Sequence, residues 1–383
     1  MKNLFIKLKL PDDLVNLVLK YLTKSQKNLL YEKKGKKKIK TEEIIRYDPK
    51  LMVRLIKNFN RIKMIEFSSK HGKLENIKWL WKNTEKYYYY CNHNIFRYAA
   101  RNGNLENMKW LFDHHQFKYI YDGGMAFAYA AENGNLENMK WLHDNYFEYN
   151  SLVFSYAAAH GNLENMKWLL EKKFPYNKST FARAARVGIL ENMKWLLENK
   201  FPYHENTFLC AAMNGNLENM KWLLENKFSY DKWTFAYAAK NGNLENMKWL
   251  LENKFPYDEK TFAYAAKNGN LKNMKWLLKN GFPYNESVFN HAAKNGKLEN
   301  MEWLLENKFP FNKMVFGYAA LNGNLENMKW LLKNKFPYDI LTVEYAIMNG
   351  NLTNIKWLLE NEFPYDKYMK KKIKKKFRNN KNS

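Results

Sequence analysis

Cysteine and histidine are the residue types in this chain with the clearest potential for chemistry, because both can bind metals. The chain has only two cysteines and eight histidines. Five of these ten residues fall in one stretch of the sequence: Cys91, His93, His114, His115 and His143. Zinc sites usually pair such ligands at short spacings, and no Cys-x-x-Cys or His-x-x-x-His pair is present. We therefore expect scattered surface histidines here, with no bound metal.

Motifs of catalysis and nucleotide binding are also missing from the sequence. The chain has no P-loop, HExxH, GxSxG or dinucleotide-binding glycine pattern. Its acidic residues recur at regular intervals, which is typical of solvated helix faces and not of a catalytic carboxylate pair. We predict that the protein is not an enzyme and uses no cofactor.

The composition predicts a folded, intracellular protein. Hydrophobic residues make up 46% of the 383-residue chain and aromatic residues 17%, which excludes a disordered chain. Two cysteines cannot build a disulfide framework, so a reducing compartment such as the cytoplasm is expected. No apolar run reaches the 18 or so residues of a membrane span, and we expect a soluble monomer.

Most of the positive charge lies at the two ends of the chain. The formal net charge is +26, of which residues 1–70 carry +12 and residues 367–383 carry +9. Such basic blocks are usually solvated, but they can also serve as nuclear addresses or electrostatic tethers. Binding of nucleic acid or an anionic surface through these ends is therefore one hypothesis for function.

An internal repeat fills the region between the basic ends. The heptapeptide LENMKWL or a close variant occurs eleven times, and the spacing of its tryptophan is 31 residues twice and then 27 residues eight times. We divide the chain into an N-terminal helical segment (1–63), the repeat array (64–366) and a basic tail (367–383). The tryptophans are Trp79, Trp110, Trp141, Trp168, Trp195, Trp222, Trp249, Trp276, Trp303, Trp330 and Trp357.

Each repeat has the pattern of two short helices. In the unit that begins at Thr261, small and aromatic apolar residues recur at helical spacing and Gly269 follows as a helix stop. Asn270 suits the N-cap of the second helix, on which Met274 and Trp276 are expected in the core. One such pair cannot bury its own apolar face, so the fold class is all-α, a solenoid of about eleven stacked helix-turn-helix repeats.

The residues Ala265–Leu271 and Met274–Gly281 resemble the ankyrin repeat, whose pattern is AAxxGxLxxVxxLLxxGA. The ankyrin repeat has 33 residues; here six are missing from the segment that forms the family's β-hairpin finger. The closing glycine is kept at Gly281 and replaced by lysine in other units. Short Asn- and Lys-rich repeats of this kind are similar to those of giant DNA viruses of amoebae, which would place a viral protein in the host cytoplasm. The lysines at the glycine position are Lys200, Lys227, Lys254, Lys308 and Lys335.

The resemblance implies a scaffold that binds a protein partner along the concave face lined by the first helices. Two positions there vary between units, and their Tyr, Arg, Lys and Met residues suit protein-protein hot spots. The alternative is that the tyrosines pack between units and only the second position is exposed. The expected partner-binding residues are Arg183, Arg186, Met213, Tyr237, Lys240, Tyr264, Lys267, His291 and Lys294.

The repeated asparagine of the LENMKWL motif should form a ladder along the array. Asn165, Asn192, Asn219, Asn246 and Asn273 occupy equivalent places, so their amides can form hydrogen bonds between units. Loss of one ladder amide is expected to destabilise the array more than loss of a surface lysine.

A further resemblance precedes the array. The stretch Leu10–Leu22 resembles the opening of an F-box, which in that family contacts the Skp1 adaptor of a cullin ubiquitin ligase. The protein would then be a substrate adaptor. The alternative is a plain amphipathic helix that caps the solenoid. The residues expected to contact Skp1 are Leu10, Pro11, Leu14, Val18 and Leu22.

Overall fold

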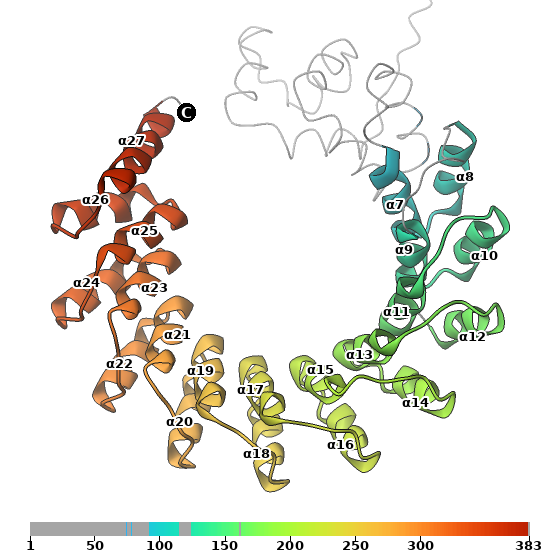
Figure 1. Ribbon diagram of the computed structural model, residues 1–383, viewed down its shortest axis with the longest axis horizontal. Helices are drawn as coiled ribbons and strands as arrows, with labels where there is room; N and C mark the ends of the chain where they lie inside the picture. The colour runs from blue at the N-terminus through green and yellow to red at the C-terminus, as the bar shows by residue number, and fades with distance from the viewer. Residues whose placement is uncertain (1–73, 75–77, 79–91, 115–123, 161, 382–383) are drawn as a thin grey trace, which may run out of the picture. The chain divides into compact units, whose positions relative to one another are not determined.

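The computed structural model describes residues 92–114, 124–160 and 162–381, together with Leu74 and Lys78. Every regular element in this part of the chain is a helix (Figure 1). The chain divides into two compact units: unit 1 comprises residues 1–184 and 191–202, and unit 2 comprises residues 185–190 and 203–383. The first repeat, around Trp79, and the predicted Skp1-binding segment, Leu10–Leu22, lie outside the described residues.

The helices alternate between the two kinds that the sequence predicts. The first helices of the repeats are α7 (Asn92–Asn102), α9 (Met125–Asn133), α11 (Ser151–His160), α13 (Lys178–Val187), α15 (Thr207–Asn214), α17 (Lys232–Asn241), α19 (Glu259–Asn268), α21 (Ser287–Asn295), α23 (Met314–Asn322) and α25 (Ile340–Asn349). The second helices are α8 (Leu105–His114), α10 (Leu136–Asp144), α12 (Leu163–Glu171), α14 (Leu190–Glu198), α16 (Leu217–Glu225), α18 (Leu244–Glu252), α20 (Leu271–Lys279), α22 (Leu298–Glu306), α24 (Leu325–Lys333) and α26 (Leu352–Glu360). A final helix, α27 (Lys367–Lys381), follows them.

Within each unit the helices form two layers. In unit 2 the first helices pack side by side from α15 to α25, and each also packs on the second helix of its own repeat. Figure 1 shows these first helices along the inner side of unit 2 and the second helices along its outer side. In unit 1, α9 packs between α7 and α11 in the same manner. The predicted all-α solenoid is thus confirmed.

The first helix and the following turn form as the sequence predicts. On α19, Phe262, Ala265 and Ala266 are fully buried. Gly269 ends the helix with φ +79°, and its N–H donates to the carbonyl of Ala265 at 3.1 Å. Because this left-handed conformation is costly for residues with a Cβ, glycine suits the position. Asn270 then caps α20, its side-chain oxygen accepting the N–H of Lys272 at 3.1 Å.

The second helix buries less of its tryptophan than the sequence predicts. Met274 and Leu277 of α20 are fully buried, whereas Trp276 is half-buried. The other described tryptophans of the motif are half-buried too, except Trp168, which is 9% exposed. The expectation that Met and Trp both belong to the core therefore holds for Met, while the indole forms the edge of the core. It can do so because one side of the ring packs on the phenylalanine that follows the helix.

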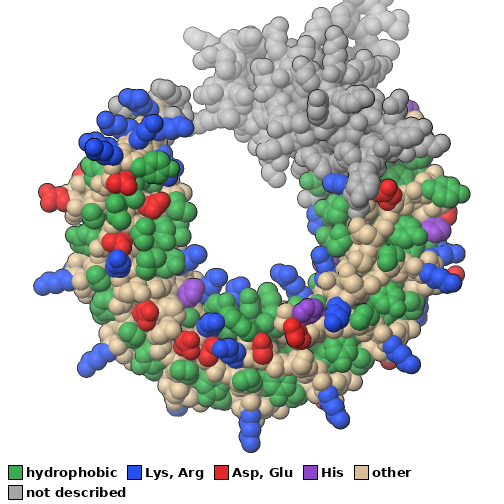
Figure 2. Space-filling view, viewed as in Figure 1, with side chains coloured by type: hydrophobic (Ala, Val, Ile, Leu, Met, Phe, Trp, Pro, Cys, Tyr) green, Lys and Arg blue, Asp and Glu red, His purple; other side chains and the backbone are tan. Residues whose placement is uncertain are grey.

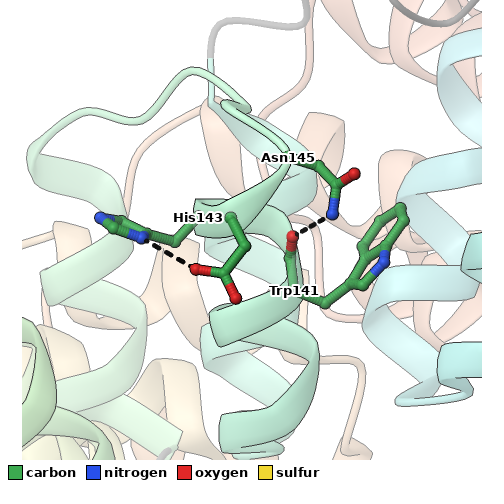
Figure 3. Close-up of polar contacts among 4 residues, drawn as sticks. Trp141, His143 and Asn145 are labelled. Atoms are coloured by element: carbon green, nitrogen blue, oxygen red, sulfur yellow. Dashed lines mark hydrogen bonds and ion pairs between the residues drawn. The ribbon is translucent and has the colours of Figure 1, made fainter.

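The ends of most second helices are fixed by an asparagine. Figure 3 shows this contact in α10, where the Asn145 side chain donates to the carbonyl of Trp141 at 2.8 Å. The following residue takes a left-handed conformation, with φ +69° at Gly281 but also φ +57° at Lys254. The same asparagine contact occurs at Asn199, Asn226, Asn253, Asn280, Asn307, Asn334 and Asn361, at 2.7–2.8 Å.

An aromatic stack occupies the segment in which the ankyrin finger is missing. Phe282 is 2% exposed and packs on Tyr257 of the preceding linker, with ring centroids 4.1 Å apart. It also contacts Phe235 of α17 at 5.1 Å and Trp276 of its own repeat at 5.7 Å. Equivalent stacks follow α16, α18, α22 and α24. The Phe-Pro-Tyr linker thereby joins consecutive repeats through its own core.

The repeated asparagines do bond between repeats, but to the backbone. Asn273 donates from Nδ2 to the carbonyl of Gly242, in the preceding repeat, at 2.7 Å. The predicted hydrogen bond between units therefore occurs at Asn273, and its acceptor is the carbonyl of the helix-ending glycine. Equivalent bonds join Asn246 to Gly215, Asn327 to Gly296 and Asn354 to Gly323. The side chains of Asn165 and Asn219 make no hydrogen bond to the described protein atoms.

The basic C-terminal segment, expected as a tail, is the packed helix α27. It takes the place of a first helix and contacts α25 and α26. Met369 and Ile373 are 5% and 7% exposed and occupy the places of Thr261 and Ala265 in α19. Lys370 is exposed where α19 has the buried Phe262. The helix therefore has a core-facing side, and it lacks the buried phenylalanine that α19 has at Phe262.

Candidate functional site

Six of the nine residues predicted to bind a partner fall in one stripe along the first helices of unit 2. In α19 this stripe consists of Lys260, Tyr264 and Lys267, which are spaced i, i+4 and i+7 on one helix face. We call the equivalent residues of α17 to α25 the first-helix stripe. Figure 2 shows Lys and hydrophobic side chains along the inner edge of unit 2, where these helices lie. The other members are Trp233, Tyr237, Lys240, Ser287, His291, Lys294, Met314, Tyr318, Leu321, Leu341, Tyr345 and Met348.

The tyrosines of the stripe pack on one another and remain partly exposed. Tyr237 and Tyr264 meet edge to face at 5.4 Å between ring centroids, and Tyr264 meets His291 at 6.3 Å. All three side chains are half-buried. These rings therefore pack between repeats and stay partly accessible, and their contact with a partner stays a prediction.

Trp233 belongs to the same surface and is not among the residues predicted from the sequence. This indole is half-buried, 6.4 Å from Tyr237 and 6.2 Å from Tyr264 between ring centroids. Lys260 Nζ lies over its ring at 4.1 Å. The sequence does contain a signal for this residue. Trp233 falls outside the LENMKWL motif, at a position where packing between repeats does not require a tryptophan.

Three lysines stand in a row beside these rings. Lys240 lies with Nζ 5.1 Å from the Tyr237 ring centroid, and Lys267 5.9 Å from that of Tyr264. Lys294 lies 5.7 Å from the ring centroid of Tyr318 on the next helix. Cation–π contacts of this length contribute about 0.5–1 kcal/mol at exposed sites. The aromatic rings thus hold the ammonium groups near the stripe.

No carboxylate neutralises this row within the described part of unit 2. The ion pairs in unit 2 join other lysines, for example Lys232 to Asp258 at 3.0 Å and Lys313 to Asp339 at 3.1 Å. Hydrogen bonding to Asp258 raises the pKa of Lys232. The row of Lys240, Lys267 and Lys294 is therefore a local excess of positive charge on a nearly neutral array.

The pKa values of the stripe respond to this crowding. Burial, followed by the charges of Lys240 and Lys294, lowers the pKa of Lys267. Burial and the charges of Lys267 and Lys294 lower the pKa of His291, which favours its neutral form. Burial, followed by the neighbouring Tyr237, raises the pKa of Tyr264. An anionic group placed here would stabilise the charged forms of both Lys267 and His291.

The remaining predicted residues lie on α13 and α15, which precede the stripe. In unit 1, the Arg183 guanidinium lies 4.6 Å from the ring centroid of Tyr156. In unit 2, Arg186 is exposed and Met213 is half-buried. Burial raises the pKa of the Cys210 thiol, and the charge of Arg186 partly offsets this effect.

The first helices of unit 1 differ in charge. Arg101 forms an ion pair with Glu132 at 2.9 Å, and Glu132 occupies the same place in its repeat as Lys267 does in α19. The unpaired positive row is thus a property of the first helices of unit 2.

The histidines considered for zinc do not gather in the described part of the chain. There, no group of three or more His, Cys, Asp or Glu residues could hold a metal ion. His143 lies beside Asp144 at 3.5 Å (Figure 3), and His114 contacts the carbonyl of Trp110 at 2.9 Å. Among the described helices, none has the length and apolar character needed to cross a membrane.

Comparison with known proteins supports the ankyrin resemblance. The sequence model of the family described as "Ankyrin repeats (3 copies)" matches the chain in overlapping windows from residue 96 to residue 371. No curated protein sequence matches the chain significantly. The matched region begins beyond Leu10–Leu22, so the contact with Skp1 stays a prediction.

Solved structures similar to the chain are helical repeat proteins. One is the pentatricopeptide repeat protein PPR10 in complex with an 18-nt psaJ RNA element, with 11% identity and a TM-score of 0.39. The match covers 95% of this chain and 65% of that one, so the chain spans about two thirds of its length. PPR10 from maize matches with 11% identity and a TM-score of 0.35, covering 92% of this chain and 61% of that one.

Proposed function

Because the chain belongs to the ankyrin-repeat family, we propose that it is a non-catalytic scaffold that binds a protein partner along the first-helix stripe of unit 2. The observation that carries this proposal is the division of labour within each repeat. Residues that hold the repeats together are nearly identical from unit to unit, whereas the stripe varies: from α17 to α25 its first position is Trp, Lys, Ser, Met and Leu, and its last position is Lys three times and then Leu and Met. Variation confined to a partly exposed face is what partner recognition requires.

The chemistry of the stripe supports protein binding. Trp233, Tyr237 and Tyr264 form a joined aromatic surface, and tryptophan and tyrosine are enriched at binding hot spots. Their rings are held in place by contacts between repeats, so little side-chain entropy remains to be lost on binding. The second helices expose mainly the same Glu and Lys residues in each repeat, which offers a partner little to distinguish.

Peptide display with a photo-crosslinker tests the proposal. The full chain would carry benzoyl-phenylalanine either at Lys267, in the stripe, or at Lys275, on the exposed side of α20. Segments selected from a random peptide library should crosslink at Lys267 and not at Lys275. Failure to select any segment, or crosslinking only at Lys275, would overturn the proposal.

Helix α27 supports a second candidate function, the binding of an anionic surface or nucleic acid. Lys370, Lys371, Lys374 and Lys375 are exposed on this helix, which has no acidic residue. Such binding would weaken steeply with salt through counterion release. Replacing these four lysines with alanine should abolish retention on heparin while crosslinking at Lys267 persists; unchanged retention would exclude this function for α27.

A further inference from the structure

The middle of the first-helix stripe is a positively charged segment without internal counter-ions. Helices α17, α19 and α21 together carry a single acidic residue, Glu259, in the first turn of α19. Lys240, Lys267 and Lys294 follow one another on these helices, and none belongs to an ion pair within the described residues. Burial, followed by repulsion from Lys240 and Lys294, lowers the pKa of Lys267. A bound anion would relieve this repulsion.

The ends of the row are apolar. At the position of Lys267, α15 has the half-buried Met213, α23 has the half-buried Leu321 and α25 has Met348, which is 65% exposed. Read from α15 to α25, the row is therefore one apolar residue, three lysines and two apolar residues, and the exposed Arg186 of α13 precedes it. A polymer that is negatively charged along its whole length is therefore not the best match for this row. Its charged groups beyond the three lysines would lie against the apolar Met213 and Met348.

The spacing of the row matches an extended peptide. Neighbouring packed helices lie about 8–10 Å apart. An extended chain in the polyproline II conformation has three residues per turn and advances about 3.1 Å per residue, so every third side chain of a peptide lying across the helices is on the same side and would face the next position of the row.

We propose that the partner of the stripe is an extended acidic segment of a protein, with carboxylates at every third residue over Lys240, Lys267 and Lys294 and apolar residues at the same spacing over Leu321 and Met348. This inference rests on the proposed function and specifies the chemistry of the partner. Each carboxylate forms a charge-assisted contact with one lysine, and the tyrosines beneath supply hydroxyl groups at the edge of the contact.

A single-stranded nucleic acid fits the stripe less well. Binding of single strands depends on bases that stack on open aromatic faces. Here Lys260 Nζ lies over the Trp233 ring at 4.1 Å, and the Tyr237 ring meets the neighbouring Tyr264 edge to face at 5.4 Å. These rings are therefore occupied by the protein's own side chains, whereas the ammonium groups above them remain accessible to a carboxylate.

Synthetic peptides test the spacing directly. The probe is a fluorescein-labelled peptide with three glutamates at every third position, leucines at the next two such positions and serines between them. The row does not determine in which direction the peptide runs across the helices, so binding of a peptide with the reversed sequence is measured too. With the full chain at low salt, fluorescence anisotropy should show that one of the two binds at least about five-fold more tightly than a peptide of equal composition with adjacent glutamates.

Charge reversal identifies the surface. The triple variant K240E/K267E/K294E should weaken binding of the probe roughly ten-fold, because three exposed ion pairs, each of them weak, are lost and replaced by repulsion between like charges. The matched variant K221E/K248E/K275E places the same charge change on the exposed second helices and should leave the affinity within about two-fold. Circular dichroism spectra of both variants check that they remain folded.

Three results would overturn the proposal. Equal binding of the spaced and adjacent peptides would contradict the spacing, and equal loss in the two triple variants would contradict the surface. Tighter binding of a labelled oligouridylate than of either peptide, lost in K240E/K267E/K294E, would show a nucleic-acid site. If displayed segments without acidic residues crosslink at Lys267, the acidic partner is wrong while the proposed scaffold function stands.

Discussion

At the scale of single residues, the sequence predicts the local conformation well and the partners of buried polar groups poorly. The stop at Gly269 and the cap at Asn270 depend on neighbours within one turn, and both occur as predicted. The bond from Asn273 to the carbonyl of Gly242 joins residues 31 apart. Its acceptor is a backbone atom, whose position depends on how two repeats stack, so residue types alone could not identify it.

We predict that Asn273→Ala destabilises the protein more than Asn219→Ala. Both side chains are fully buried, but only Asn273 donates a hydrogen bond to the preceding repeat. Its loss leaves the carbonyl of Gly242 without this donor, at a cost of about 1–3 kcal/mol. Thermal unfolding of the two variants measures the difference, with Lys275→Ala as the surface control. Equal melting temperatures for all three variants would contradict the role assigned to Asn273.

The protonation of His291 is a second residue-scale prediction. Tyr264 on α19 and the charges of Lys267 and Lys294 surround its imidazole, and its pKa is lowered from 6.5 by burial and then by both lysines. The unfolded chain therefore takes up the proton first as the pH falls, and stability is lost from about pH 6.5 down to the folded pKa. His291→Asn should lose less stability than the parent protein between pH 7 and pH 5 in urea unfolding; an identical loss would contradict the lowered pKa.

At the scale of elements, both helices of each repeat follow from the periodicity, while the linker does not. The sequence shows that the ankyrin finger is missing but not what replaces it. In the structure Phe282 fills this place, in contact with Tyr257, Phe235 and Trp276. Phe235 lies on α17, Trp276 on α20 and Tyr257 in the linker before α19. These residues come together only when neighbouring repeats stack. For the same reason Trp276 is half-buried where helical periodicity alone predicted a core residue.

The ends of the second helices offer a stabilising substitution. Lys254 has φ +57°, a conformation that costs a residue with a Cβ about 1–2 kcal/mol and glycine much less. Lys254→Gly should therefore raise the free energy of unfolding by roughly 0.5–1 kcal/mol after the entropy cost of glycine. Chemical denaturation measures this change. Lys248→Gly, within α18, is the control and should destabilise the protein by about 1 kcal/mol. A similar loss of stability in Lys254→Gly would contradict the left-handed conformation of Lys254.

At the scale of the whole molecule, the sequence predicted the distribution of charge but not the structure of its C-terminal part. Residues 367–383 carry +9 and contain few apolar residues, which favours a solvated tail. In the structure two of those few, Met369 and Ile373, are buried against the last repeat. A helix face of two residues is too weak a periodic signal to recognise. The repeat register gives a better one, because Phe363-Pro364-Tyr365-Asp366 introduces α27 as the same motif introduces α19.

We predict that α27 closes the array. Met369→Asp with Ile373→Asp should destabilise the protein by about 3 kcal/mol, because two buried apolar side chains are replaced by charges. It should also cause self-association, since the side of α25 that α27 covers becomes available to another molecule. Thermal unfolding and analytical ultracentrifugation measure the two effects. Lys371→Asp with Lys374→Asp is the control; an equal effect from it would contradict the closing role.

The central claim is that the first-helix stripe of unit 2 binds an acidic segment through Lys240, Lys267 and Lys294. The most direct measurement is an exchange of charge between the two sides. A peptide with lysines in place of the three spaced glutamates should bind K240E/K267E/K294E at least about five-fold more tightly than it binds the parent protein, while the glutamate peptide shows the opposite order. If both peptides bound more tightly to the same one of the two proteins, direct pairing of charges at the stripe would be contradicted.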